Sequence, residues 1–281
     1  MNVLYCRIFQ SFFVHIPFYS DQVFIAPKME AIFSYITIII GQKTAAYISI
    51  DADAIHAMHF SLKIYALKNT KATVLFYLAK QTEHHFRIMH VTVHADDYAQ
   101  IRYQFALYDN TYLKKEIIAR SDGNQSNIEI IGKYIATPHT QLYCDTYQYH
   151  EHPDTQSNVT VEGVSTKHSS VTHQGFIFIA PRATGTRTKQ SSKHITLSKT
   201  VHVHAQPILD VQNNTVSCSH ASAIGTINQE MIFYMSSRGV STHDATFLAA
   251  QTYALLNPTH QIEHALYARA KRILQSALRQ L

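Results

Sequence analysis

Short runs of β-branched and aromatic residues, separated by polar turns, follow one another from about residue 22 to residue 227. Clear examples are Ile36–Ile40, Thr73–Leu78 and Phe86–Val93, whose side chains suit a pleated, half-buried surface. No stretch of about a dozen residues in this region keeps the apolar spacing of a helix, which argues against alternating strands and helices. The region therefore predicts a β-sandwich, a β-barrel or a β-solenoid.

Turn signals help to choose among these three architectures. Tight hairpins favour Asn-Gly or Asp-Gly, and the chain holds no Asn-Gly and a single Asp122-Gly123. Exact internal repeats are absent, so repetition alone does not identify a solenoid. The scarcity of hairpin signals favours a solenoid slightly over the two antiparallel architectures.

The pattern changes after Gly225. A helix is expected over Glu230–Ser237, with Arg238-Gly239 as its stop signal. Ser241-Thr-His-Asp244 resembles a capping box that starts a second helix. Pro258 breaks this helix, and a third has an apolar stripe formed by Ile262, Leu266, Ala270, Ile273, Leu274 and Ala277. We therefore expect a short N-terminal segment (1–21), a β domain (22–227) and a helical domain (228–281).

Composition limits the classes of function. The content of 46% hydrophobic and 15% charged residues excludes a wholly disordered chain. The net charge of +5 is scattered rather than clustered, so no nucleic-acid partner is expected. The three cysteines, Cys6, Cys144 and Cys218, suggest no disulfide framework and fit a reducing compartment, the cytoplasm. The apolar run 31–40 is too short to cross a membrane, which takes about 20 residues.

A thiol and an imidazole lie two residues apart near the end of the β region. On a strand, Val216, Cys218, His220 and Ser222 share one face. Thiolate and imidazole together suit iron–sulfur clusters, zinc or copper. Two ligands do not complete a metal site, so the metal would be transient or a second chain would supply the rest. Alternatively, Cys218 is a small buried hydrophobe and His220 a histidine without a metal.

A second pair of histidines allows another function. His150 and His152 form the His-x-His pattern that cupin-like metal enzymes use, and on a strand both rings would share a face. The alternative function is therefore a cupin-like metal-dependent enzyme. Pro153, Thr155 and Ser157 follow, so the segment could equally be a turn. The sequence has no phosphate-binding Gly-x-x-x-x-Gly-Lys loop and no Gly-x-Ser-x-Gly elbow, so neither ATP hydrolysis nor serine-hydrolase chemistry is expected.

Ordered motifs over the second half of the chain resemble the SufB/SufD family of iron–sulfur cluster assembly proteins. The motifs are His150-x-x-Pro153-x-Thr155-x-Ser157, Gly163-Val164, Gly175-Phe-Ile-Phe, Thr186, Gln190, Pro207-Ile-Leu-Asp-Val, Val216-Ser-Cys-Ser-His220, Gly225, Phe233-Tyr and Ser237-Arg-Gly-Val. The resemblance implies a mainly β fold: a right-handed parallel β-helix followed by a C-terminal α-helical domain. Residues 22–149 match only in their strand-rich character.

The resemblance also implies partners and a site. Family members pair through their β-helices and dock the SufC ATPase on their helical domains, here 228–281. The Cys-Ser-His tripeptide resembles the SufD branch, since SufB usually shows Glu-His-Glu there. His220 then matches a histidine implicated in building a nascent cluster at the SufB–SufD interface, and Cys218 matches its less certain neighbour. We therefore expect a non-enzymatic scaffold subunit that shares a transient iron–sulfur cluster with a SufB-like partner and has no tightly bound cofactor.

Overall fold

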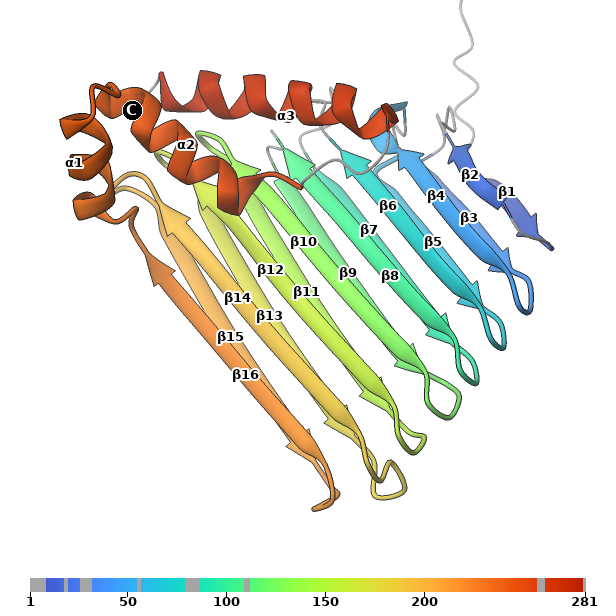
Figure 1. The fold of residues 1–281 in the computed structure, drawn as a ribbon. Coiled ribbons are helices and arrows are strands. Elements are labelled where there is room, and N and C mark those ends of the chain that lie inside the picture. Colours follow the sequence, from blue (N-terminus) through green and yellow to red (C-terminus); the bar gives the residue numbers. More distant parts are fainter. Residues whose placement is uncertain are drawn as a thin grey trace, which may run out of the picture.

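The chain forms a parallel β-solenoid, in which successive strands alternate between two stacked sheets (Figure 1). The computed structural model describes residues 9–17, 20–25, 32–54, 57–78, 86–108, 112–256 and 261–279. The strands are β1 (Phe9–Ile16), β2 (Ser20–Ile25), β3 (Phe33–Ile40), β4 (Ala45–Asp51), β5 (His59–Ala66), β6 (Lys71–Leu78), β7 (Arg87–Ala95), β8 (Gln100–Tyr108), β9 (Tyr112–Ser121), β10 (Asn127–Ala136), β11 (Gln141–His150), β12 (Gln156–Ser165), β13 (Ser170–Ile179), β14 (Arg187–Thr196), β15 (His202–Val211) and β16 (Ser217–Gly225).

Each strand pairs in parallel with the strand two places further along the chain. The odd-numbered strands make one eight-stranded sheet and the even-numbered strands make the other. The connection between paired strands passes through the opposite sheet, so the fold needs no hairpin turns, and this explains why hairpin signals are scarce. The mainly β parallel solenoid is confirmed, and the sandwich and barrel alternatives are excluded because antiparallel pairing is absent from the described strands.

The lumen of the solenoid changes character along its length. Because side chains alternate across a strand, every second residue points between the sheets. In the first coils these residues are apolar, among them Ile36, Ile38, Ile48, Phe60, Leu62, Val74 and Phe76. In the last coils many are polar and still buried, among them Thr146, Gln148, His150, Ser157, His173, Thr188, Gln190 and His194. Those buried polar groups need partners inside the solenoid.

One row of turns is held by a ladder of backbone hydrogen bonds. Asn69, Tyr98, Gln125 and Asp154 occupy equivalent turn positions with positive φ angles. The backbone N–H at each position donates to a carbonyl of the following coil, at 2.7 to 3.2 Å. The left-handed conformation aims these N–H groups along the solenoid axis, so each turn is tied to the next coil.

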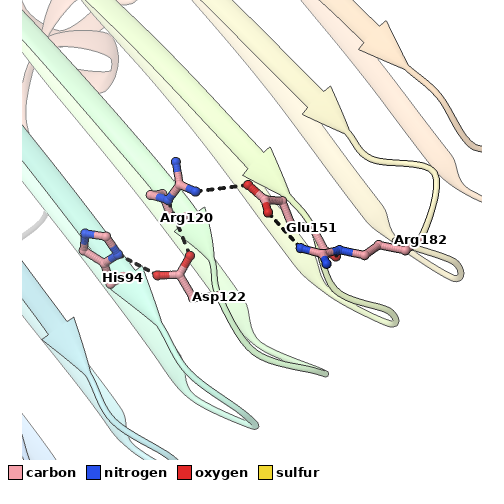
Figure 2. A network of polar contacts seen from close by, with 5 residues as sticks. All are labelled: His94, Arg120, Asp122, Glu151 and Arg182. Atoms are coloured by element: carbon pink, nitrogen blue, oxygen red, sulfur yellow. Dashed lines mark hydrogen bonds and ion pairs between the residues drawn. The ribbon is translucent and has the colours of Figure 1, made fainter.

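A network of charged side chains joins neighbouring coils beside these turns (Figure 2). His94 Nδ1 lies 2.6 Å from Asp122, and Arg120 contacts both Asp122, at 3.4 Å, and Glu151, at 3.0 Å. Arg182 reaches Glu151 from the coil beyond, at 2.9 Å. The side chains are partly exposed, so we expect each pair to add at most about 1 kcal/mol. Their alternating charges favour the observed order of the coils.

Three helices follow the last strand. They are α1 (Gln229–Ser237), α2 (Thr242–Ala254) and α3 (Gln261–Leu278), in agreement with the expected helical region. The Asn228 side chain caps α1, and the Ser241 hydroxyl accepts from the Asp244 N–H at the start of α2. Gly239 ends the first helical segment with a φ of +88°, as its stop signal predicts. Pro258 lies outside the described residues.

The helices cover the outer face of the even-numbered sheet near the ends of its strands (Figure 1). The outward-facing residues Tyr108, Ile135 and Val164 belong to one apolar cluster with Phe247 and Ala250 of α2. In α3, Arg269 forms an ion pair with Asp53, which lies in the short 3₁₀ helix Ala52–Ala54. No helix within the described residues is long and apolar enough to cross a membrane.

The solenoid begins earlier than the expected boundary at residue 22. Strand β1 spans Phe9–Ile16 and pairs with β3 over its whole length. The expected boundary therefore falls inside β2. At the other end, β16 stops at Gly225 and α1 starts at Gln229, which agrees with the expected change of character after Gly225.

Candidate functional site

The candidate site lies at the C-terminal end of the solenoid, on its last strand. In β16, Cys218 pairs with Thr188 of β14 and His220 pairs with Gln190. Thr188 and Gln190 are buried and face the lumen, so Cys218 and His220 face the same way. No further coil covers them within the described residues, and the His220 side chain is exposed. The structure thus places an imidazole at the open mouth of the lumen.

Cys218 has a different environment from His220. It is half-buried and packs against Ile177, Ile179 and Ala183, together with Val216 of its own segment. Burial raises the pKa of its thiol. The side chain is therefore protonated at neutral pH, and coordination to a metal would have to release that proton. Cys218 is a less ready ligand than the exposed imidazole.

Both strands of the last coil have a free edge. Among the described strands, β15 bonds only to β13 and β16 only to β14. Lumen-facing residues that neighbours would bury in earlier coils are exposed here: Leu209 is 38%, Val211 40% and Ile224 51% accessible. An edge that offers unpaired backbone groups and exposed apolar residues is a template for strand pairing with another chain.

Behind the open end, polar groups fill the lumen. The Tyr134 hydroxyl lies 2.7 Å from His194 Nδ1, and the rings of His173 and His194 are 5.6 Å apart. Burial lowers the pKa of His194 to about 4, and burial together with the neighbouring His194 lowers that of His173 to about 3. Both rings are therefore neutral at pH 7. Sequence reasoning missed these residues, because alternation in an isolated strand does not show which face is buried.

The cupin-like alternative is wrong. His150 is the last residue of β11 and is buried, with Nδ1 2.8 Å from the Thr155 hydroxyl and Nε2 2.7 Å from the Ser157 hydroxyl. Burial lowers its pKa to about 4. His152 lies beyond the strand, in the turn, so the two rings do not share a strand face. The fold is also a solenoid rather than a cupin barrel.

The remaining candidates do not build a complete metal site. Within the described part of the chain, no group of three or more His, Cys, Asp and Glu side chains could hold a metal ion. Cys144 is buried, and burial raises its pKa to about 12, so it is an inert thiol. His202 and His204 are exposed on the outer face of β15, and Cys6 lies outside the described residues. Any metal at His220 needs ligands from elsewhere.

The first helix presents an apolar surface to solvent. Phe233 is 76% and Tyr234 59% exposed, and Met231 on the same helix is 39% exposed. Leu248 of α2 adds a fourth exposed apolar side chain, at 43%. Large apolar side chains exposed on two neighbouring helices can mark a site of protein association. We call these four residues the α1–α2 apolar surface.

Comparison with known proteins places the chain among iron–sulfur assembly proteins. It is 31% identical over 142 residues to an iron–sulfur cluster assembly SufBD family protein of Mycobacterium leprae, covering 48% of this chain and 36% of that protein. It is 28% identical over 176 residues to the iron–sulfur cluster assembly protein SufD of Escherichia coli, covering 61% and 40%. Identity to SufB of Bacillus subtilis is 25% over 97 residues, covering 34% and 21%.

The chain thus spans less than half the length of these curated relatives. A family model described as SUF system FeS cluster assembly, SufBD core domain, matches residues 23–251. This range holds nearly the whole solenoid, the candidate histidine at its open end, the first helix and most of the second. The protein therefore belongs to the SufBD core domain family of iron–sulfur cluster assembly proteins.

Proposed function

We propose that this protein is a SufD-like subunit of an iron–sulfur assembly scaffold, in which His220 helps to hold a nascent cluster at an interface with a SufB-like partner. The observation that carries the proposal is the exposed imidazole of His220 on β16, the last strand of its sheet, whose outer edge has no partner among the described strands. A cluster must form and then leave, and a site that a partner completes suits both steps. The Cys-Ser-His sequence at 218–220 supports the SufD-like assignment.

The free edge supplies the means of pairing. The backbone N–H of Ser217 donates to the Thr186 carbonyl, so the backbone N–H groups of the odd-numbered residues of β16 point toward β14. The N–H groups of His220 and Ser222 then point toward the free edge. A partner strand that bonds to this edge would bring its own side chains beside His220, where they could supply the missing ligands.

The helical region supplies a second contact. The α1–α2 apolar surface offers Phe233 and Tyr234 to a partner, and we propose a SufC-like ATPase as that partner. Movement of the ATPase subunits would open or close the cluster interface. In this scheme the chain itself performs no ATP hydrolysis and retains no cluster permanently.

The first experiment tests the cluster role. We would co-express the protein with SufB-like and SufC-like partners, purify the complex, supply iron and sulfide without oxygen, and record the absorption spectrum. His220→Ala should abolish cluster accumulation while the complex still assembles. His202→Ala, which changes an exposed histidine on the outer face of β15, is the matched control. An unchanged cluster yield in the His220→Ala complex would contradict the proposal.

A second experiment tests the two contacts separately. Ser222→Pro removes an N–H from the free edge and keeps the backbone bonds to β14, but it also removes the 2.9 Å hydrogen bond from the Ser192 hydroxyl to the Ser222 hydroxyl. Ser222→Ala removes only that hydroxyl contact and is the matched control, so Ser222→Pro should reduce co-purification of the SufB-like partner more than Ser222→Ala does. Phe233→Ser should reduce binding of the SufC-like ATPase, whereas Tyr98→Ser, at an exposed tyrosine in a distant turn, should not. Undiminished co-purification of either partner would refute the corresponding contact.

A further inference from the structure

A polar groove of about 510 Å³ crosses the outer face of the even-numbered sheet, where strands β10 to β16 begin. Its lining includes Glu129, Asn158, Arg187, Lys189, Ser217 and Ser219. The helices cover the same sheet near the opposite ends of its strands. His220 faces the lumen, whereas these side chains face outward, so the groove is separate from the candidate cluster site.

The strand register brings four hydrogen-bond donors together on this surface. Arg187 pairs with Ser217, and Lys189 pairs with Ser219, on the neighbouring strands β14 and β16. Paired residues on adjacent strands lie roughly 5 Å apart, and residues two apart along a strand lie roughly 7 Å apart. The four side chains therefore start from the corners of a small rectangle, and all four can reach one oxyanion between them.

The positive charge in the groove is not neutralised by the protein. The side chains of Arg187 and Lys189 are exposed, and neither forms an ion pair or hydrogen bond with any described residue. The acidic residue of the lining, Glu129, already accepts from Arg102 at 2.5 Å. Two adjacent cations are thus available to an anion, and the guanidinium can bind a carboxylate or phosphate through two parallel hydrogen bonds.

The floor of the groove adds a requirement for a donor. Asn158 lies beside Lys189 in the register, and its side-chain oxygen is buried with no hydrogen-bond partner in the described part of the chain. A buried acceptor without a partner costs free energy, so a rotation of the Asn158 side chain that lets this oxygen accept from a hydroxyl of an occupant would be favoured. The groove thus combines two cations for an oxyanion with an acceptor for a hydroxyl group.

We propose that this groove binds a small anion that carries both an oxyanion and a hydroxyl group. Two kinds of metabolite share this chemistry, hydroxycarboxylates and phosphate monoesters of polyols. The volume lies within the range of small-molecule sites, roughly 300 to 1,000 Å³. The inference does not depend on the proposed cluster function, because the four donors that it invokes face outward, away from the lumen.

Titration calorimetry on the 281-residue protein at low ionic strength tests the proposal. Citrate and tricarballylate differ only by a hydroxyl, and glycerol 3-phosphate and n-propyl phosphate differ only by the two hydroxyls of the glycerol moiety. If the ligand is a hydroxycarboxylate, citrate should bind saturably and tricarballylate more weakly. If it is a phosphate monoester of a polyol, glycerol 3-phosphate should bind saturably and its counterpart without hydroxyls more weakly. The combined change Arg187→Gln and Lys189→Gln should weaken binding about tenfold or more.

Two further variants separate specific binding from general charge effects. Lys63→Gln removes an exposed lysine from the outer face of the other sheet and should leave the affinity unchanged. Asn158→Leu should abolish the preference for the hydroxylated anion while retaining binding of the oxyanion. Absence of saturable binding at millimolar concentrations for all four anions, or equal affinity in the double variant and the unaltered protein, would overturn the proposal.

Discussion

The side chain of Gln190 in β14 lies across the lumen against Gly175 in β13. A Cβ added to Gly175 would lie 1.3 Å from the Gln190 side-chain nitrogen, which is far closer than any two such atoms can approach. Gln190 is 2% exposed, so its amide has little room to move away. The lumen is therefore filled by contacts between the sheets, and a missing side chain in one sheet makes space for a long one in the other.

Gly175→Ala should lower the free energy of unfolding by about 1 to 3 kcal/mol, because the new methyl group overpacks the lumen. Urea denaturation measures this change. Shortening the opposing side chain with Gln190→Ser in the same protein should restore part of the loss. Gly225→Ala is the control, since no atom lies within 4 Å of its added Cβ. Equal stability of Gly175→Ala and the unaltered protein would show that Gln190 does not fill this space.

The helical segment shows how local signals in the sequence predict local structure. Ser241 and Asp244 were expected to start a helix, and the Asp244 N–H does donate to the Ser241 hydroxyl, at 3.1 Å. Gly239 was expected to adopt a positive φ, and it does. Caps and stops depend on a few neighbouring residues, so a single sequence contains the information that specifies them.

The lumen shows what the sequence alone could not predict. His150, His173 and His194 alternate with other residues in polar-looking strands, and that pattern also fits a solvent-exposed face. Their burial follows from the register between coils about 30 residues apart, and the varied turn lengths hide this repeat in the sequence. The exposure of His220 likewise depends on β16 being the last strand of its sheet. Its role in cluster assembly stays a prediction.

Lys115 gives the first pH-dependent prediction. It is fully buried, with its ammonium 4.2 Å from the centre of the Phe76 ring and 3.2 Å from the Tyr103 hydroxyl. Burial lowers its pKa from 10.5 to about 7. Above pH 7 the unfolded chain therefore binds more protons than the folded one, so this lysine makes stability rise with pH, by at most about 1.4 kcal/mol per unit.

Urea denaturation between pH 7 and 8.5 should show this rise. This window lies below the pH at which the thiol of Cys144 affects stability. Burial raises the pKa of this thiol from 9.0, so only above about pH 9 does the unfolded chain lose its thiol proton before the folded one, and stability then falls. Lys115→Met should stabilise the protein at pH 7 and flatten the slope. Lys114→Met, which changes the exposed neighbouring lysine, should preserve the slope. A slope that survives Lys115→Met would assign the titration to another group.

The buried histidines predict a loss of stability in acid. Burial lowers the pKa of His150 and His194 to about 4, and burial with the adjacent His194 lowers that of His173 to about 3, from 6.5. Below pH 6.5 these histidines bind protons in the unfolded chain but stay neutral in the folded chain, so stability falls as pH falls toward 4. Denaturation from pH 6.5 to 5 measures this slope before most carboxylates titrate.

His173→Gln should reduce that slope by at most roughly a third, because it removes one of the three protons of the buried histidines and His59, whose pKa is also lowered by burial, adds a further contribution. The same change at His202, which is exposed on β15, should not alter it. An unaltered slope in His173→Gln would mean that the ring is already accessible to protons in the folded protein.

Lys133 connects the solenoid to the helices, and its removal should loosen them. Its ammonium donates to Glu162 at 2.6 Å and to the Thr252 carbonyl in α2 at 3.2 Å, and its side chain is only 11% exposed. Lys133→Met leaves both acceptors without this donor, so we expect a loss of about 1 to 3 kcal/mol. Hydrogen exchange of the α2 amides should accelerate more than exchange in the central strands.

Lys68→Met, which breaks the exposed pair with Asp97, should cost less than about 1 kcal/mol and leave α2 unchanged. Uniform acceleration over the solenoid and the helices would show that Lys133 stabilises the whole fold rather than the docking of α2.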